Sequence, residues 1–221
     1  MRMNTHNLIT RAQRNLRTVA VAAACLIASF GGNAMAESTP SPTTPNSLKT
    51  AIFAGGCFWC MQSEFAHRPG VISTTVGYSG GSVPNPTYEQ VGTGKTGHRE
   101  ALMLTYNPAE VSYDDLLKIF WSNVDPLDAT GQFCDQGPQY KSAVFYSAEA
   151  EKQAAEASKQ KLAEKLGQPV MTDILPATPF YAAEAEHQNY SEKNPFKYKL
   201  YRGGCGRDGR LNELQKKMKT P

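Results

Sequence analysis

The sequence lacks the features that mark a membrane-spanning, zinc-binding or nucleic-acid-binding protein. Its one extended apolar stretch, residues 19–30, is shorter than the roughly 20 residues that a transmembrane helix needs. It has a single Cys-x-x-Cys, at residues 57–60, and no second close cysteine pair to complete a zinc site. Residues 92–97 contain three glycines but not the order of a phosphate-binding loop. No Lys/Arg-rich patch with interleaved aromatics is present, so we expect no nucleic-acid partner.

The first 36 residues have the pattern of a secretory signal peptide. Four arginines and no acidic residue flank the start of the apolar stretch, and Ala34-Met35-Ala36 is a typical cleavage site. We therefore expect cleavage after Ala36 and a mature protein in the periplasm or outside the cell. In the alternative of a lipoprotein, Cys25 would be acylated, but the residues before it match an acylation signal poorly.

The rest of the chain predicts a linker followed by one domain. Residues 37–49 are rich in Ser, Thr and Pro, which is typical of a disordered linker, and residues 50–221 are the expected catalytic domain. Loss of the four signal-peptide arginines takes the formal net charge from +3 to −1. The charge of the whole chain therefore indicates no acidic partner.

Predicted strands and helices alternate along the domain without internal repeats. The strands are expected at residues 51–54, 71–78, 98–106, 142–146 and 170–175. The helices are expected at residues 57–65, 113–123, 148–166, 180–190 and 211–219. This alternation predicts a single α/β or α+β domain with a mixed sheet.

The stretch Gly-Gly-Cys-Phe-Trp-Cys at residues 55–60 lies between a predicted buried strand and a predicted helix. A cysteine there sits at a helix N-terminus, where free N–H groups and the helix dipole favour the thiolate. The two glycines let the backbone turn sharply and leave the Cys57 sulfur approachable. Phe58 and Trp59 can form the wall of an apolar pocket. The stretch therefore predicts a nucleophilic cysteine that acts on a small apolar group.

A series of blocks in the same order along the chain resembles the type A peptide methionine sulfoxide reductases. The blocks are Gly-Cys-Phe-Trp (56–59), Gly-Tyr-Ser-Gly-Gly (77–81), Pro-Asn-Pro-Thr-Tyr (84–88), Thr-Gly-His-Arg-Glu (96–100), Gly-Gln-Phe-Cys-Asp (131–135), Gln-Tyr-Lys-Ser (139–142), Glu-His-Gln-Asn-Tyr (186–190) and Cys-Gly-Arg-Asp (205–208). The resemblance covers about residues 51–214. It implies an α+β fold in a single domain: a two-layer α/β sandwich whose mixed sheet has a ferredoxin-like core.

The resemblance also implies the activity, that of a peptide-methionine (S)-S-oxide reductase. Such an enzyme reduces methionine S-sulfoxide, free or in proteins, and so repairs proteins after oxidation. It uses no metal or organic cofactor. Its electrons come from a thioredoxin-like or other periplasmic dithiol. We further expect a monomer with no stable membrane association.

The same resemblance assigns roles to individual residues. Cys57 is the nucleophile, which becomes a sulfenic acid, and Glu100 is the acid, which must be kept protonated by burial. By the same resemblance, Tyr88 and Tyr140 donate hydrogen bonds to the sulfoxide oxygen, and Phe58 and Trp59 contact the substrate methyl group. Asp135 orients the substrate. Cys205 converts the sulfenic acid to an intramolecular disulfide.

Two cysteines leave open questions. Cys60 stands where many family members have glycine, and it could compete with Cys205 as the resolving thiol. We expect Cys205 because its flanking glycines predict a mobile loop. Cys134 is interpreted as a buried thiol without a catalytic role.

Two other functions remain as alternatives. One is an exported thiol-disulfide oxidoreductase that uses Cys57 and Cys60, although thioredoxin-like motifs usually place Trp before the first cysteine. The other is a module that binds methionine sulfoxide without turnover. His98 and His187 are expected to form structural hydrogen bonds rather than to act in catalysis.

Overall fold

The structure is a computed structural model that describes residues 47–219. The expected signal peptide and nearly all of the expected linker lie outside the described residues. No helix within residues 47–219 is long and apolar enough to cross a membrane.

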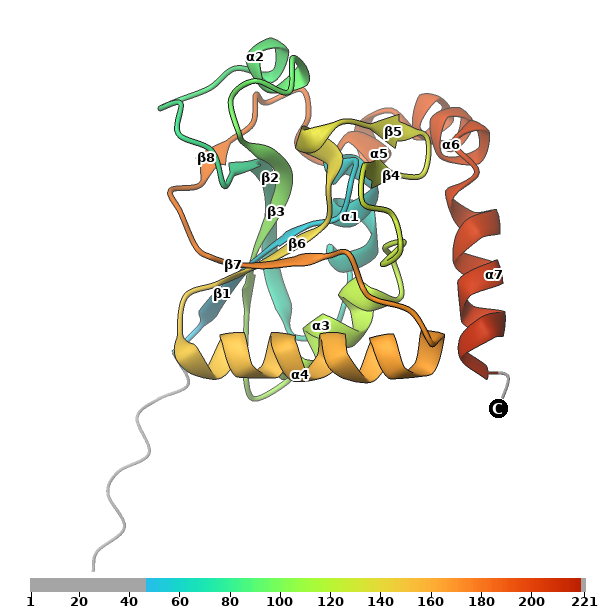
Figure 1. The fold of residues 1–221 in the computed structure, drawn as a ribbon. Coiled ribbons are helices and arrows are strands. Elements are labelled where there is room, and N and C mark those ends of the chain that lie inside the picture. The colour runs from blue at the N-terminus through green and yellow to red at the C-terminus, as the bar shows by residue number, and fades with distance from the viewer. Residues whose placement is uncertain (1–46, 220–221) are drawn as a thin grey trace, which may run out of the picture. The chain divides into compact units, whose positions relative to one another are not determined.

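The domain is built on a six-stranded mixed sheet (Figure 1). Its strands, in spatial order, are β7 (Asp173–Pro176), β6 (Ala143–Tyr146), β1 (Lys49–Ala54), β3 (Arg99–Tyr106), β2 (Val71–Ser79) and β8 (Tyr181–Ala182). All neighbours are antiparallel except β6 and β7, which are parallel. The predicted α+β class and mixed sheet are confirmed. Lys49, which the sequence placed in the linker, is the first residue of β1.

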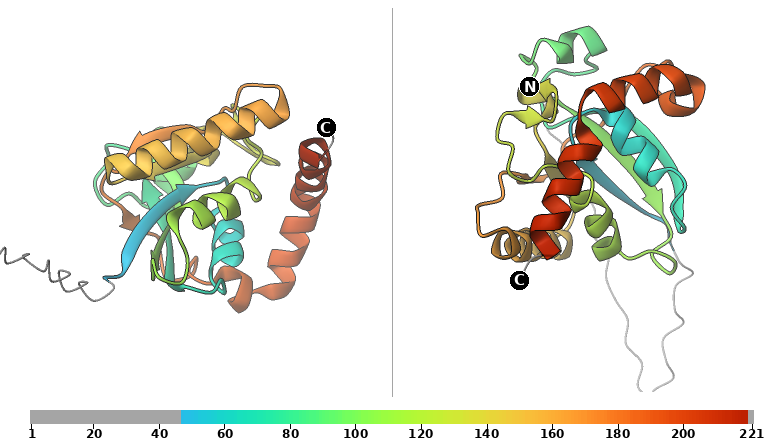
Figure 2. Two further views of the ribbon diagram at one scale, coloured as in Figure 1. Left: turned by 90° about the horizontal axis from the view of Figure 1, so that it is seen from below. Right: turned by 90° about the vertical axis from the view of Figure 1, so that its right-hand side faces the viewer.

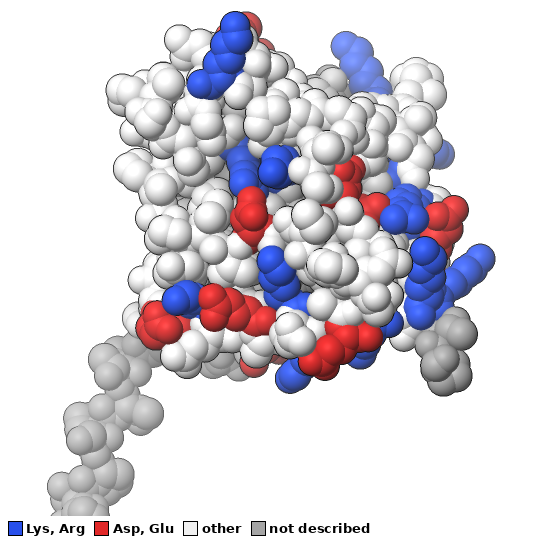
Figure 3. Space-filling model, viewed as in Figure 1, with Lys and Arg blue, Asp and Glu red and all other residues white. Residues whose placement is uncertain are grey.

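The helices are α1 (Phe58–Phe65), α2 (Tyr88–Gly92), α3 (Tyr113–Trp121), α4 (Glu149–Leu166), α5 (Tyr190–Lys193), α6 (Pro195–Gly204) and α7 (Arg207–Lys219). The main core lies between the sheet and helices α1, α3 and α4, where Phe53 of β1 stacks on Phe65 and Phe120. Figure 2 shows α7 along one side of the domain, with its C-terminal end near α4. On the face shown in Figure 3, acidic and basic side chains lie among one another, most visibly along α4.

Helix boundaries follow local sequence signals. Ser112 and Asp115 form a capping box at the start of α3, in which each side chain bonds the other residue's backbone N–H. Gly167 ends α4 in the left-handed conformation, with a φ of 64°. The N-cap of α4 is Ala148, which makes no side-chain cap.

The helix predicted at residues 180–190 is wrong, because this segment pairs with the sheet. Tyr181 and Ala182 form the edge strand β8 against β2, and the Ala183 N–H bonds the Val76 carbonyl at 2.9 Å. A Cβ at Gly77 would lie 2.2 Å from the Tyr181 carbonyl oxygen, so glycine permits this close pairing. Backbone pairing with β2 therefore overrides a weak helical pattern.

The mobile loop predicted around Cys205 is also wrong. Helix α6 continues through Gly204, Cys205 has helical φ and ψ, and Gly206 makes the turn into α7 with a φ of +70°. Opposite this junction, the segment between α3 and β6 contains a short hairpin of β4 (Gly131–Gln132) and β5 (Asp135–Gln136). The 3-10 turn Pro138–Tyr140 follows it.

Candidate active site

Cys57 lies at the predicted junction of strand and helix. β1 ends at Ala54, and Cys57 is the N-cap of α1, with its carbonyl accepting the N–H groups of Cys60 at 3.1 Å and Met61 at 3.3 Å. Gly56 has a φ of +78°, and a Cβ there would lie 2.5 Å from the Gln132 side chain. The turn therefore requires glycine, and it presents the Cys57 sulfur at the start of the helix.

The Cys57 side chain lines a cavity of about 50 Å³. Its lining residues are Cys57, Phe58, Trp59, Tyr88, Glu100, Asp135, Tyr140 and Tyr201. The cavity contains every predicted site residue except Cys205, and it adds Tyr201. A larger groove of about 600 Å³ lies along α3 and α4 but holds no cysteine and no buried acid. The chemistry therefore belongs to the smaller cavity.

Glu100 is a buried acid that keeps its proton. It lies on the core-facing side of β3, is 4% exposed, and accepts the Phe58 N–H at 2.9 Å. Burial raises the pKa of Glu100 from 4.5 to about 8, against a smaller lowering by this hydrogen bond. At neutral pH the carboxyl group is therefore mainly protonated and can donate to a ligand in the cavity.

Two phenols approach the same cavity. Burial raises the pKa of Tyr88 to about 12, and burial also raises the pKa of Tyr140. Both groups therefore keep their protons and can donate hydrogen bonds. The Tyr88 N–H is held by the Glu184 carboxylate at 2.9 Å, which fixes the first turn of α2 beside the cavity.

The apolar side of the cavity is a stack of aromatic rings. The Trp59 ring lies on that of Tyr190, with centroids 3.8 Å apart, and its indole N–H donates to His187 Nδ1 at 3.2 Å. Phe58 is 1% exposed and packs against Tyr88 and His187. His187 thus holds the aromatic wall, as expected of a structural hydrogen bonder. His98 likewise bonds backbone groups, accepting the Gly81 N–H and donating to a carbonyl.

Tyr201 is the lining residue that the sequence analysis missed. It lies on α6, and its hydroxyl donates to the Asp135 carboxylate and interacts by a hydrogen bond with the Cys57 sulfur. The phenol therefore joins the hairpin that carries Asp135 to the start of α1. The tyrosine lies four residues before Cys205, inside the segment whose helical fold the sequence analysis did not predict.

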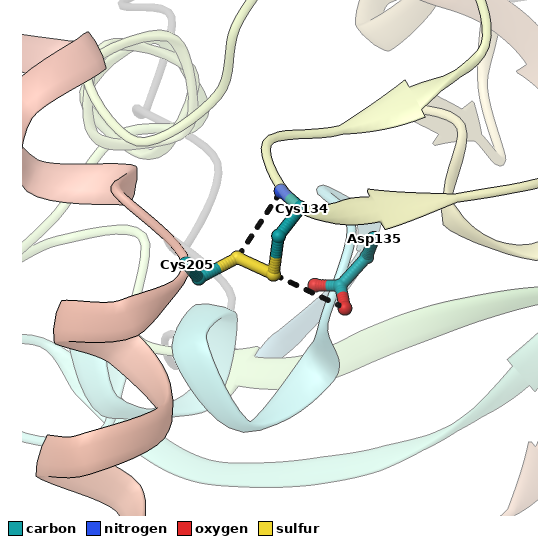
Figure 4. Close-up of side chains that lie close together, drawn as sticks. All are labelled: Cys134, Asp135 and Cys205. Atoms are coloured by element: carbon teal, nitrogen blue, oxygen red, sulfur yellow. Dashed lines mark hydrogen bonds between the residues drawn. A yellow bond between two sulfur atoms is a disulfide. The ribbon is translucent and has the colours of Figure 1, made fainter.

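The four cysteines of the described domain form one disulfide and one free pair. Cys134 and Cys205 form a disulfide, with Cα atoms 4.9 Å apart, between the hairpin turn and the junction of α6 and α7 (Figure 4). Cys134 is exposed, so its interpretation as a buried thiol is wrong. Cys57 and Cys60 are free and buried. Cys205 is therefore bonded to Cys134 and not to Cys57, and its resolving role stays a prediction.

Cys57 and Cys60 shift each other's pKa in opposite directions. Burial raises the pKa of Cys57, and the neighbouring Cys60 raises it further. The pKa of Cys60 falls from 9.0 to about 7, mainly because the Cys57 side chain hydrogen-bonds to it, with the Arg207 cation adding to the effect. These directions favour the proton on Cys57 over Cys60, contrary to the thiolate expected at Cys57 from the helix N-terminus.

Comparison with known proteins gives consistent matches over this domain. A family model described as peptide methionine sulfoxide reductase matches residues 49–219. The peptide methionine sulfoxide reductase MsrA of Bacillus subtilis is 50% identical over 165 residues, covering 74% of this chain and 93% of the relative. MsrA 2 of Caulobacter vibrioides is 44% identical over 200 residues, covering 90% of this chain and 98% of the relative.

Solved structures agree. Mxr1 from Saccharomyces cerevisiae in its reduced form has a TM-score of 0.65 at 30% identity, covering 69% of this chain and 89% of that one. Methionine sulfoxide reductase A of Corynebacterium diphtheriae has a TM-score of 0.61 at 36% identity, covering 69% of this chain and 77% of that one. The family model spans most of this chain and ends where the described residues end. The chain therefore belongs to the peptide methionine sulfoxide reductase family, as its motif blocks predicted.

Proposed function

We propose that this member of the family reduces the S epimer of methionine sulfoxide, free and in proteins, with Cys57 as nucleophile and Glu100 as acid. The observation that carries the proposal is the pairing of these two groups in one small cavity. A sulfoxide sulfur accepts a nucleophile only if its oxygen is protonated as it leaves. Glu100 suits this step because burial raises its pKa to about 8.

The reaction divides into three steps. The Cys57 sulfur attacks the sulfoxide sulfur, Glu100 supplies a proton to the oxygen, and methionine leaves while Cys57 becomes a sulfenic acid. A second thiol of the enzyme then displaces the hydroxyl group as water and forms a disulfide. A dithiol partner of the thioredoxin type reduces this disulfide. Two thiols supply the two electrons, so the cycle requires no metal or organic cofactor.

The other cavity residues bind and orient the substrate. Phe58 and Trp59 would hold the methyl group, because they form the apolar wall beside Cys57. Tyr88 and Tyr140 would donate hydrogen bonds to the sulfoxide oxygen. Asp135 would accept a hydrogen bond from the substrate backbone while Tyr201 holds its carboxylate in place.

We further propose that the enzyme acts outside the cytoplasm as a monomer. The basic start, apolar stretch and cleavage pattern of residues 1–36 support export and a mature N-terminus at Glu37. The expected reductant is then a periplasmic dithiol protein. In that compartment the enzyme would repair oxidised methionine in exported proteins.

The alternative thiol-disulfide oxidoreductase is not favoured. It has no need for a buried protonated carboxyl group, whereas Glu100 lies in the cavity with Cys57. A module that only binds the sulfoxide would likewise have no need for a buried free thiol beside that acid.

One assay separates these three functions. The protein is incubated with each epimer of methionine sulfoxide and dithiothreitol, and methionine release is measured beside the reduction of insulin disulfides. We expect release from the S epimer, no release with Cys57→Ser, and no insulin reduction above the dithiothreitol blank. Insulin reduction without methionine release would indicate the oxidoreductase, and binding without either reaction would indicate the module.

A further inference from the structure

The four cysteines of the domain form two separate pairs, and only one pair is free. We propose that Cys60 is the thiol that resolves the Cys57 sulfenic acid, so that the first disulfide of the catalytic cycle joins Cys57 to Cys60. This inference rests on the proposed function and concerns the step that follows methionine release.

The position of Cys60 places it one helical turn from the nucleophile, so no rearrangement of the fold is needed to bring the two cysteines together. Cys60 is the third residue of α1, and its N–H bonds the Cys57 carbonyl at 3.1 Å. Cys57 precedes the helix with a ψ of 118°, and the two buried thiols lie close enough to shift each other's pKa in opposite directions. Side chains three residues apart at a helix surface have Cβ atoms about 5–6 Å apart. Cys57 is the N-cap and not yet part of the helix, so a small local shift of its backbone brings the two Cβ atoms to the roughly 4 Å that a disulfide takes.

Cys205 meets two obstacles to the same role. Its sulfur is already bonded to Cys134, so that disulfide would first have to be reduced. The backbone of Cys205 is helical and joins α6 to α7. Arg207, two residues further along the chain, is only 1% exposed and anchors this junction. The Arg207 guanidinium donates to the carbonyl oxygens of Gly55 at 3.2 Å and Asn123 at 2.5 Å. A swing of Cys205 toward Cys57 would pull on these buried contacts.

The surroundings of Cys60 favour the reactive form of a resolving thiol. A thiolate, rather than a thiol, attacks an oxidised sulfur. Within residues 47–219 the buried Arg207 makes hydrogen bonds and a ring contact but no ion pair with a carboxylate, and its charge acts on Asp135 and Asp208 as well as on Cys60. The Arg207 charge and the Tyr198 hydroxyl both lower the pKa of Cys60, against the effect of burial.

The atoms and electrons of the cycle balance with this pair alone. Cys57 takes the oxygen from the sulfoxide, which becomes methionine, and is oxidised to the sulfenic acid. The Cys60 sulfur then forms a bond to the Cys57 sulfur, the S–O bond of the sulfenic acid breaks, and its hydroxyl group leaves as water with the proton of the Cys60 thiol. Both electrons that reduce the sulfoxide come from the two thiols, and an outside dithiol returns them.

The test is a single turnover without reductant, followed by peptide mass mapping. The proteins are the wild type, Cys60→Ser, and the double variant Cys134→Ser/Cys205→Ser as the matched control. Excess methionine S-sulfoxide is added together with dimedone, which traps sulfenic acids. Each protein should release one methionine per chain, which shows that the fold and the first step are intact.

The variants should then differ in what becomes of Cys57. In the wild type and the double variant we expect a Cys57–Cys60 disulfide and little dimedone adduct. In Cys60→Ser we expect the dimedone adduct on Cys57 in nearly every chain. A Cys57–Cys205 disulfide in the wild type would overturn the inference. So would a dimedone adduct on Cys57 that forms in the double variant but not in the Cys60→Ser variant. Absence of methionine release from the wild type would instead refute the proposed function.

Discussion

Replacing Glu100 by glutamine tests whether a buried, protonated carboxyl group drives the first step. The amide keeps the shape of the side chain and can still accept the Phe58 N–H bond, but it cannot transfer a proton. Loss of a general acid typically costs about 10²–10⁴-fold in rate. We therefore expect Glu100→Gln to lower kcat by that range, with a smaller change in KM.

The same residue should make activity and stability depend on pH in a defined direction. A pKa of about 8 leaves roughly nine-tenths of the carboxyl groups protonated at pH 7, and the acid is lost as pH rises through 8. The pKa in the fold is raised above the unfolded value of 4.5, so the contribution of Glu100 to stability is full below that value. It declines as pH rises toward 8 and is lost above it. The difference of 3.5 pKa units corresponds to about 5 kcal/mol, an order-of-magnitude figure for a side chain that is 4% exposed.

Two measurements check this reasoning. In single-turnover kinetics from pH 6 to pH 10, the wild-type rate should contain a fall centred near pH 8 that is absent from the residual activity of Glu100→Gln. In urea denaturation, the variant should gain stability over the wild type as pH rises from 5 to 9. A variant with activity within tenfold of the wild type, or with no relative gain in stability at high pH, would refute the assigned role and the raised pKa.

Three further predictions follow from other parts of the molecule. Tyr201→Phe removes a donor to Asp135 and a hydrogen bond to Cys57. Because hydrogen bonds to charged groups contribute about 1.5–3 kcal/mol, kcat/KM measured by steady-state kinetics should fall roughly 10- to 100-fold. Removing the disulfide between Cys134 and Cys205, which are 71 residues apart in sequence, should lower the unfolding free energy by roughly 2–4 kcal/mol in urea titrations, and an unchanged midpoint would count against a stabilising link. N-terminal sequencing of the exported protein should give Glu37, whereas an intact Met1 would contradict cleavage.

The local features of the site could be predicted from the sequence. The apolar strand, the two glycines and the helix after Cys57 are close together in the chain, so their geometry follows from short-range signals. The capping box at Ser112 and the glycine that ends α4 are equally local. Glu100 also lies on the predicted strand, although its burial depends on the helix that packs above it.

The features that depend on tertiary contacts could not be predicted in this way. Glycines around Cys205 are typical of a loop, yet burial of Arg207 fixes the segment as two helices joined at one turn. That docking brings Tyr201 into the cavity and Cys205 to Cys134 on the hairpin. The edge strand at Tyr181 forms only because β2 offers unpaired backbone groups. No periodicity in the sequence carries this information.

The most direct test of the account counts methionine against thiols in one turnover. The wild-type protein is mixed with excess methionine S-sulfoxide and no reductant, the reaction is stopped with an alkylating reagent, and the labelled cysteines are mapped. We predict one methionine per chain and the loss of two free thiols, with Cys57 protected from alkylation. Release of methionine while Cys57 remains fully alkylated would contradict the central claim that its sulfur takes the oxygen from the substrate.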